Sequence, residues 1–441
     1  MVPALALWAC LALGIAGGES PAPEPLADGQ PFAVVWNVPA GRCQRHFGVG
    51  LPLSDYGIVE NQDGRFAGQN ITIFYKNKFG LYPYLSRQGV PHNGGIPQRV
   101  PLDAHLARVA RDIRLLLRPA FHGLAVVDWE EWSPLWAQNW GAKRIYRAAS
   151  EQWVWDRHSF LPVWRRLRLA RREFEQAAQA LMEETLLLGR SLRPGGLWGF
   201  YRFPDCLNGN WAKEANYTGQ CRLAEVQRNN RLSWLWAASA ALYPSIYLPP
   251  ALAPALPPTA REALRVAAFG ADSLLPVVAY ARLSFRRSRR FLDLADLVHT
   301  IGESAALGAA GLVLWGDMSY SRSAESCASL RHYLVSTLGP YVANVTAAAR
   351  ECSYGQCHGH GRCVRRQPHD LGSLLHLGPS ASPPASFRCH CYRGWAGKGC
   401  ARRVHPGPAA SCLAPTHAHS LYRHEDLPPP DTCLPRGTWG W

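Results

Sequence analysis

The sequence predicts an α/β protein, a single β/α barrel followed by a small disulfide-rich module. From Gln30 to about Val345, short β-rich runs alternate with helical patterns, which is the signature of βαβ units. From Cys352 the composition changes to closely spaced cysteines interleaved with glycine and histidine. More than 300 residues of alternation fit one barrel better than an open sheet, although the pattern does not by itself require closure.

Composition narrows the class of protein. The chain has 441 residues, 47% of them hydrophobic, with 47 Lys plus Arg against 32 Asp plus Glu and therefore a net charge of +15. These figures exclude a disordered chain, a small disulfide scaffold and a long coiled coil. The only long apolar run is N-terminal and too short for repeated membrane spans, so we expect no spanning bundle. The charge suits nucleic acid, a membrane surface or an acidic polymer.

The N-terminus indicates the secretory pathway. Val2 to Ala16 are nearly all apolar, and small residues precede a cut after Gly18, which predicts a signal peptide at 1–18; an uncleaved anchor is the alternative. Cleavage removes Cys10 and leaves twelve of the 13 cysteines, an even number. Three glycosylation sequons fit this compartment and argue against a nucleic-acid partner: Asn70, Asn216 and Asn344.

The predicted barrel elements follow from periodicity. Spacings of three and four from Phe174 to Leu186, with a stop at Pro194, predict an amphipathic helix that leads into the next strand. A second such unit runs from Leu294 through Leu307 into a strand at Leu312 to Trp315. The β-rich runs are Gly123 to Trp129, Leu197 to Phe203 and Ala310 to Trp315.

Six cysteines between Cys352 and Cys400 form a module. Their spacing is C-x4-C-x5-C, then 25 residues, then C-x-C-x8-C, and the last part is specific to an EGF-like framework. A zinc site is the competing interpretation, because His358 and His360 lie among the cysteines, but an oxidising compartment favours paired sulfurs. The predicted disulfides are Cys352–Cys363, Cys357–Cys389 and Cys391–Cys400.

The expected organisation has four parts. A signal peptide at 1–18 precedes a barrel at 19–348, an EGF-like module at 349–401 and a Pro-rich, disordered tail at 402–441. The tail holds Cys412 and Cys433, which either pair with each other or remain available to another chain.

The most informative segment is the apolar run Leu124 to Val127, which ends in acids. In a β/α barrel the carboxyl ends of strands carry the chemistry. Alternation puts Asp128 and Glu130 on one face, roughly 6.6 Å apart along the chain, and Glu131 on the other. Two carboxylates on one face cannot both ionise at low cost, so one should have a raised pKa, as a general acid requires.

Aromatic residues favour a carbohydrate site over the solvated strand end that an ordinary D-x-E would be. Aromatic faces stack on sugar rings, so tryptophans that floor an acid pair indicate a glycosidase. Four lie within twelve residues: Trp129, Trp132, Trp136 and Trp140. Other predicted strand ends carry Tyr75, Tyr201, Asp205, Tyr247, Trp315 and Asp317.

Other chemistries lack their motifs. The sequence has no H-E-x-x-H, no G-x-S-x-G, no Walker loop and no G-x-G-x-x-G after a strand. Paired cysteines disfavour a thiol nucleophile. We expect no metal and no cofactor.

From Phe32 to about Cys400 the sequence resembles the hyaluronidase family of glycoside hydrolases. The long, ordered motifs that carry the resemblance are WNVP (Trp36 to Pro39), NITIFY (Asn70 to Tyr75), DWEEW (Asp128 to Trp132), LWGFY (Leu197 to Tyr201), YPSIY (Tyr243 to Tyr247) and GESAALGAAGLVLWGD (Gly302 to Asp317).

The resemblance implies a distorted barrel that cleaves β-1,4 bonds of hyaluronan by a substrate-assisted retaining mechanism. Glu130 would be the acid/base, Asp128 would hold the acetamido group of the substrate, and Tyr247 would bind its carbonyl. Tyr201 and Trp315 would shape the subsite, and Tyr75 and Asp205 match cleft positions. The implied barrel disulfides are Cys43–Cys327 and Cys206–Cys221. The product would be secreted or delivered to an acidic vesicle.

One departure supports an alternative. The family commonly has C-Y-N where this chain continues from Cys206 with Leu207, Asn208 and Gly209, so an aromatic wall is missing. The alternative is a protein that binds hyaluronan or a partner with little catalysis. Chondroitin is a second candidate substrate, and the partner of the EGF-like module is not identified.

The net charge suits a polyanionic sugar. The clusters Arg165 to Arg172 and Arg286 to Arg290 would attract its carboxylates. A solvated helix face or loop is the plainer interpretation of each cluster.

Overall fold

The computed structural model describes residues 22, 24–26, 29–206, 220–248, 258–269, 274–285 and 288–404. Several predictions lie outside these residues: the signal peptide, the Asn216 sequon, the Leu207–Gly209 turn, Cys412, Cys433 and the tail beyond residue 404.

The strands are β1 (Ala33–Asn37), β2 (Ile71–Tyr75), β3 (Tyr84–Leu85), β4 (Pro91–His92), β5 (Leu124–Asp128), β6 (Leu197–Phe200), β7 (Val278–Arg282), β8 (Gly311–Trp315), β9 (Gly361–Arg365), β10 (Phe387–Cys391), β11 (Trp395–Ala396) and β12 (Arg402–Arg403). The helices are α1 (Gly41–Phe47), α2 (Leu102–Leu116), α3 (Arg144–Arg157), α4 (Val163–Leu192), α5 (Leu223–Asn230), α6 (Ser233–Ala238), α7 (Pro258–Val266), α8 (Leu294–Leu297), α9 (Glu303–Ala306), α10 (Ala324–Tyr333) and α11 (Gly339–Cys357).

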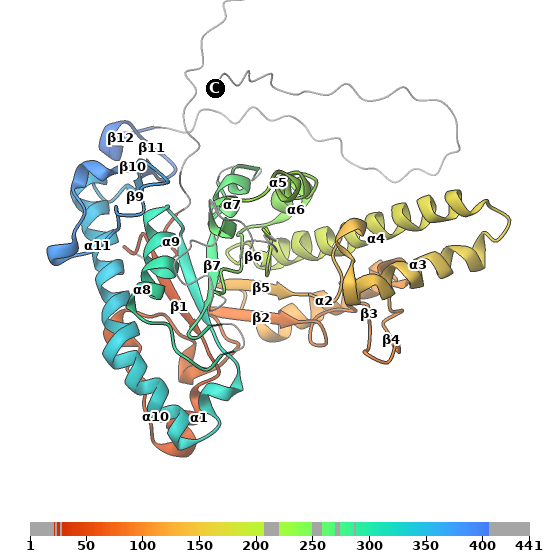
Figure 1. The fold of residues 1–441 in the computed structure, drawn as a ribbon, viewed down its shortest axis with the longest axis horizontal. Helices are drawn as coiled ribbons and strands as arrows, with labels where there is room; N and C mark the ends of the chain where they lie inside the picture. Colours follow the sequence, from red (N-terminus) through yellow and green to blue (C-terminus); the bar gives the residue numbers. More distant parts are fainter. Residues whose placement is uncertain are drawn as a thin grey trace, which may run out of the picture. The chain divides into compact units, whose positions relative to one another are not determined.

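The barrel consists of two arcs of three parallel strands each, β2-β5-β6 and β1-β8-β7 (Figure 1). The irregular segment 242–245 bridges β6 on one side and β7 on the other. On the opposite side Val59 bridges β1, and the Asn61 side chain bonds to both backbone groups of Ile71 in β2, at 2.9 and 3.1 Å. The predicted distorted barrel is confirmed, and its distortion lies in these two irregular connections.

The inside of the barrel is filled by alternate residues of the strands, as the twofold period of a strand requires. The remaining strand residues face outward and pack against the helices in two larger clusters. The interior cluster comprises Val35, Ile71, Ile73, Leu124, Val126, Ala241, Tyr243, Val278, Tyr280 and Val313.

Gly199 in β6 allows the segment 242–245 to approach. A Cβ at this position would lie 2.2 Å from the carbonyl oxygen of Ala241, closer than any side chain permits. Glycine is therefore required where the barrel closes between β6 and β7.

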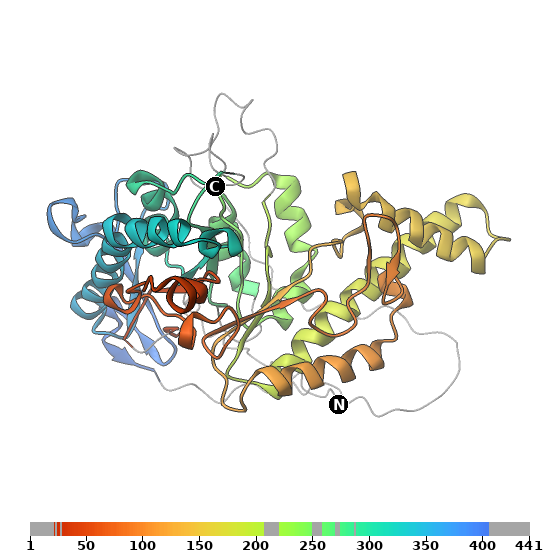
Figure 2. The same cartoon turned by 90° about the horizontal axis from the view of Figure 1, so that it is seen from below.

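The helix predicted from Phe174 to Leu186 is the central part of α4, which runs from Val163 to Leu192 and ends before Pro194. Its buried residues recur at spacings of three and four. With α3, it forms a helical hairpin that extends away from the strands (Figures 1 and 2).

The EGF-like segment contains the three expected disulfides, Cys352–Cys363, Cys357–Cys389 and Cys391–Cys400. No sulfur of the six is left to bind zinc. The barrel pairs are Cys43–Cys327 and Cys206–Cys221, as the family resemblance implied.

Two domain boundaries differ from the prediction. The boundary expected at residue 349 falls inside α11, because one continuous helix carries barrel core residues and both Cys352 and Cys357. The tail expected from residue 402 begins with β12, whose Arg402 and Arg403 pair with β11. Local composition does not reveal either feature.

Candidate active site

The carboxyl ends of the parallel strands meet at one end of the barrel. In the register, Tyr75 at the end of β2 lies opposite Asp128 at the end of β5. Across the other arc, Trp315 at the end of β8 lies between Asn37 of β1 and Arg282 of β7. Residues from distant parts of the sequence therefore surround one site, as is usual for this fold.

Asp128 continues the inward-facing row of β5 that begins with Leu124 and Val126. Its Oδ1 is buried and has no hydrogen-bond partner among the described residues. Burial, and then the nearby charge of Glu130, raises the pKa of Asp128 to about 7, while Arg202 and Lys76 oppose the rise. The raised pKa expected of one member of the acid pair therefore falls on Asp128.

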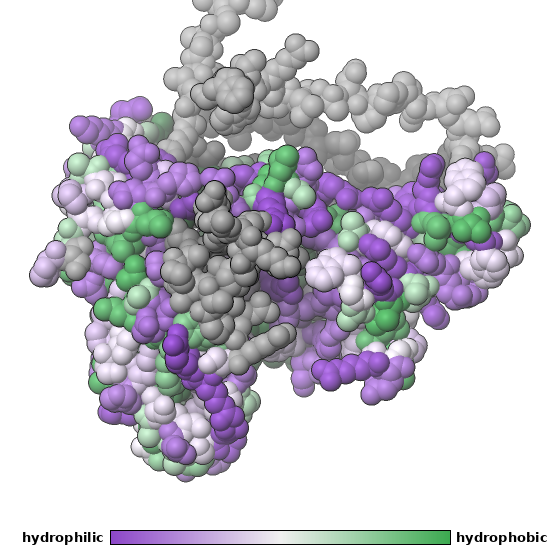
Figure 3. Space-filling view, viewed as in Figure 1, coloured by the Kyte–Doolittle hydropathy of each residue, from purple (hydrophilic) through white to green (hydrophobic). Residues whose placement is uncertain are grey.

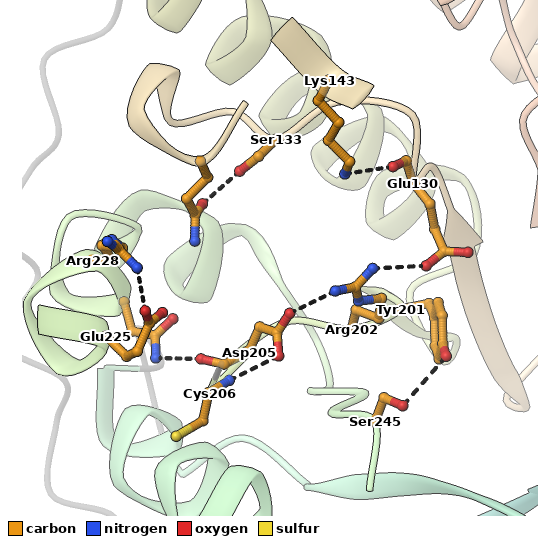
Figure 4. A network of polar contacts seen from close by, with 12 residues as sticks. Glu130, Ser133, Lys143, Tyr201, Arg202, Asp205, Cys206, Glu225, Arg228 and Ser245 are labelled. Carbon is orange, nitrogen blue, oxygen red and sulfur yellow. Dashed lines mark hydrogen bonds and ion pairs between the residues drawn. The ribbon is translucent and has the colours of Figure 1, made fainter. Parts of the chain in front are cut away.

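Glu130 lies just beyond the strand, and its side chain is 46% exposed, so a substrate can reach it. Its Oε1 accepts a hydrogen bond from Arg202 at 3.2 Å, and its backbone carbonyl accepts one from Lys143 at 2.7 Å. Figure 4 shows the Arg202 guanidinium between the carboxylates of Glu130 and Asp205. The acid is thus held from two sides.

Glu131 points elsewhere, as alternation predicts. Its carboxylate forms an ion pair with Lys76, which follows β2, and its backbone N–H donates to the Tyr82 hydroxyl at 3.1 Å. Glu130 and Glu131 therefore belong to different ion pairs.

Aromatic rings also surround the site. Tyr247 stacks on Trp315 with ring centres 6.2 Å apart and lies 6.3 Å from the ring of Tyr201. The Trp315 indole N–H donates to the Tyr75 hydroxyl at 3.5 Å. Burial raises the pKa of Tyr247 well above its usual range, so its hydroxyl remains a neutral donor.

Asp205 acts on the site through Arg202. One carboxylate oxygen accepts from Arg202 at 2.8 Å and the other from the backbone N–H of Cys206 at 2.8 Å. Both oxygens are engaged, so Asp205 supports the guanidinium rather than presenting a free carboxylate to a ligand.

The prediction that tryptophans floor the acid pair is wrong for Trp129 and Trp132. Trp129 and Trp132 are only 4% and 3% exposed, and both belong to the core outside the barrel. Trp129 is adjacent to Asp128, so alternation turns it to the other side of β5, where it stacks on Tyr82 at 4.7 Å. Trp140 is 60% exposed.

Sequence reasoning missed three cations of the site. Arg202 has a φ of +68°, a left-handed conformation that non-glycine residues rarely adopt and that often marks a functional constraint. Arg282 lies over the Trp315 ring at 5.0 Å and pairs with Asp317 at 3.3 Å. Arg202 and Arg282 could have been found as residues at strand ends, whereas Lys143 carries no such signal.

The hyaluronidase family model matches residues 21–383. The chain belongs to the hyaluronidase family. It is therefore a glycoside hydrolase by family, as the sequence motifs predicted.

Its relatives include hyaluronidase-3 proteins of mammals. It is 55% identical to hyaluronidase-3 of Homo sapiens, over 92% of this chain and 98% of that protein. Identity to hyaluronidase-3 of Mus musculus is 59%, over 84% and 92%.

Solved structures of bee venom hyaluronidase share the fold. One superposes with a TM-score of 0.63 at 32% identity, covering 71% of this chain and 99% of that one. A second, in complex with a hyaluronic acid tetramer, gives a TM-score of 0.64 at 32% identity, covering 70% and 98%.

Four further features bear on the sequence-based expectations. In the described part of the chain, no cluster of three or more His, Cys, Asp or Glu could hold a metal ion, and no helix could cross a membrane. Asn70 is exposed. Asn344 lies in α11, half-buried, and its amide accepts from the Leu377 backbone N–H at 3.1 Å.

Proposed function

We propose that this protein hydrolyses the β-1,4 bonds of hyaluronan between N-acetylglucosamine and glucuronate, within the polymer chain. The observation that carries the proposal is the buried, unpartnered Oδ1 of Asp128 beside the exposed carboxylate of Glu130. An acceptor kept dry and unbonded is ready for an amide N–H, and the acetamido group of the substrate supplies one. Family membership and the bee relative crystallised with a hyaluronic acid tetramer support the substrate.

In the proposed mechanism Glu130 is the acid/base. It donates a proton to the glycosidic oxygen while the carbonyl oxygen of the substrate's own N-acetyl group attacks the anomeric carbon and the leaving chain departs. Glu130 then removes a proton from water, which opens the cyclic intermediate with overall retention. Burial raises the pKa of Asp128 to about 7, so at mildly acidic pH a proton is present in the site beside Glu130.

Asp128 and Tyr247 position the nucleophile. Asp128 accepts the acetamido N–H and stabilises the positive charge of the intermediate, and the neutral hydroxyl of Tyr247 donates to the carbonyl oxygen. Tyr201, Tyr75 and Trp315 enclose the sugar, and Arg202, held by Asp205, keeps Glu130 in place.

Purified protein incubated with high-molecular-weight hyaluronan from acidic to neutral pH tests the proposal. We expect the polymer to shorten, and we expect Glu130→Gln to reduce the rate about a thousandfold while leaving the fold intact. Glu131→Gln is the matched control and should retain most of the activity, because Glu131 pairs with Lys76 outside the reaction. A polymer of unchanged length at every pH would contradict the proposal.

The same assay addresses the alternative functions. Binding of hyaluronan without shortening would favour a binding protein on a hydrolase scaffold. Initial rates on chondroitin and hyaluronan, compared at equal disaccharide concentration, would establish the preferred polymer. We further propose that the protein enters the secretory pathway, since the sequence predicts a cleaved signal peptide at 1–18 and sequons.

A further inference from the structure

Apart from the candidate active site, a hollow lies beside the loop that follows β5. It measures ≈ 430 Å³, a size suited to small-molecule ligands, and is formed by that loop, α4 and the start of α6. Its lining includes four arginines, one acid and one indole: Arg168, Arg171, Arg172, Arg231, Glu175 and Trp234.

The charges in this hollow do not balance. Glu175 is shared by Arg171 at 3.5 Å and Arg231 at 3.3 Å, and it also accepts from the Trp136 backbone N–H at 2.9 Å. One carboxylate thus serves two guanidinium groups.

The other two arginines of the hollow face water. Arg168 and Arg172 are exposed, and neither has a carboxylate partner in the described part of the chain. Arg168 lies over the Trp164 ring at 5.5 Å. Two guanidinium forks therefore remain available to an anionic ligand, and such forks match the geometry of a carboxylate.

The hollow lies close to the acid/base. Pro134 in its lining follows Glu130 by four residues, so their Cα atoms are within about 15 Å of each other. Figure 3 shows hydrophilic and hydrophobic side chains interspersed over the α3–α4 hairpin at the right of the molecule. A polymer with one stretch at Glu130 therefore has a basic, partly apolar surface within reach.

We propose that this hollow is an exosite for hyaluronan, which binds glucuronate carboxylates of the chain away from the bond that is cleaved. The proposal rests on the proposed function for its ligand. Arg168 and Arg172 pair with carboxylates, and the Trp234 face contacts a sugar ring. Holding the polymer at a second point raises its effective concentration at the cleft.

Binding is measured with Glu130→Gln protein, which leaves the polymer intact, on immobilised long-chain hyaluronan at low and physiological salt. Arg168→Gln with Arg172→Gln should weaken binding roughly fivefold and reduce its salt sensitivity. The matched control is Arg111→Gln with Arg114→Gln on exposed positions of α2. Glutamine keeps the helix propensity in both pairs. Lysine at 168 and 172 should restore part of the affinity.

Turnover gives an independent readout in protein that retains Glu130. The 168/172 variant should raise KM for the polymer and leave kcat unchanged, and it should cleave a short oligosaccharide at the wild-type rate. Equal polymer affinity in the 168/172 and 111/114 variants would overturn the exosite, even if the wild-type protein is active. Arginine-dependent binding by a protein that never shortens the polymer would support the exosite and contradict the proposed hydrolysis.

Discussion

Asp128 has unusual chemistry because of where β5 ends. It is the last inward-facing residue of the strand, so its carboxyl group meets the packed interior on one side and the cleft on the other. Burial without a hydrogen-bond partner penalises the charged form, and Glu130 adds to the penalty. A site that needs a proton near neutral pH obtains one at the expense of stability.

Asp128→Asn should therefore stabilise the fold at pH 8 while abolishing turnover. The pKa of Asp128 is about 7 in the folded state against an ordinary value of 3.8. Between these pH values the folded state binds more protons than the unfolded state, so the contribution of Asp128 to stability falls as pH rises through this window. Urea unfolding should show a gain on the order of 2 kcal/mol for the variant at pH 8 and almost none at pH 3. A variant less stable than wild type at pH 8 would show that burial of charge is not the dominant effect.

Arg202 should set the pH range of activity. Its guanidinium favours the ionised form of Asp128 and lowers the pKa of that carboxyl. Arg202→Gln should therefore keep the proton on Asp128 to higher pH and move the alkaline limb of the kcat/KM profile upward by about half a unit or more. Arg202→Lys, which keeps the charge, should return the limb toward its original position. An unmoved limb would restrict Arg202 to a structural role.

At the scale of elements, the alternation of side chains along β5 and just beyond it places site residues on one face and core residues on the other. Asp128 faces the barrel interior, whereas Trp129 faces α2 and packs edge-on against His105 at 5.6 Å. The rule that separates Glu130 from Glu131 also removes Trp129 from the cleft. The tryptophan-rich segment thus led to a correct prediction of a glycosidase, although Trp129 and Trp132 are core residues.

A second pair of elements, β9 and α9, joins the EGF-like segment to the barrel. Arg365 and Glu303 form an ion pair across them and are 2% and 3% exposed. Arg362 of β9 also donates to the Gly308 carbonyl at 3.3 Å. The disulfide-rich segment is therefore fixed to the barrel by buried polar contacts.

Arg365→Met should destabilise the protein by about 3–5 kcal/mol, because it leaves the carboxylate of Glu303 buried and unpaired. The double variant Arg365→Met with Glu303→Gln should be closer to wild type, since no lone charge remains. Chemical unfolding of the two variants and of Arg366→Met, an exposed neighbour, provides the comparison. A double variant as unstable as the single one would argue that packing, not charge, dominates.

At the scale of the whole molecule, the site depends on strand ends that are far apart in sequence. Tyr75, Asp128 and Trp315 end three strands and Tyr201 directly follows β6, and these residues meet because parallel strands present their carboxyl ends together. Each was identifiable as a strand-end residue, so much of the proposed site follows from local patterns and motifs. Arg202 was missed because its importance lies in a long-range ion pair with Glu130, which a local ion pair with Asp205 supports.

The sequence by itself determined the alternation of strands and helices, the cysteine spacing and the acid pair, because these are patterns between residues near one another in the chain. Only the tertiary structure decided which acid is desolvated, which tryptophans are core, and how α11 joins the barrel to the EGF-like segment. Those properties depend on burial and on charges supplied by distant elements, and local periodicity does not encode them. The same holds for the basic hollow, since Arg172 and Arg231 come together only when α4 and the residues before α6 pack side by side.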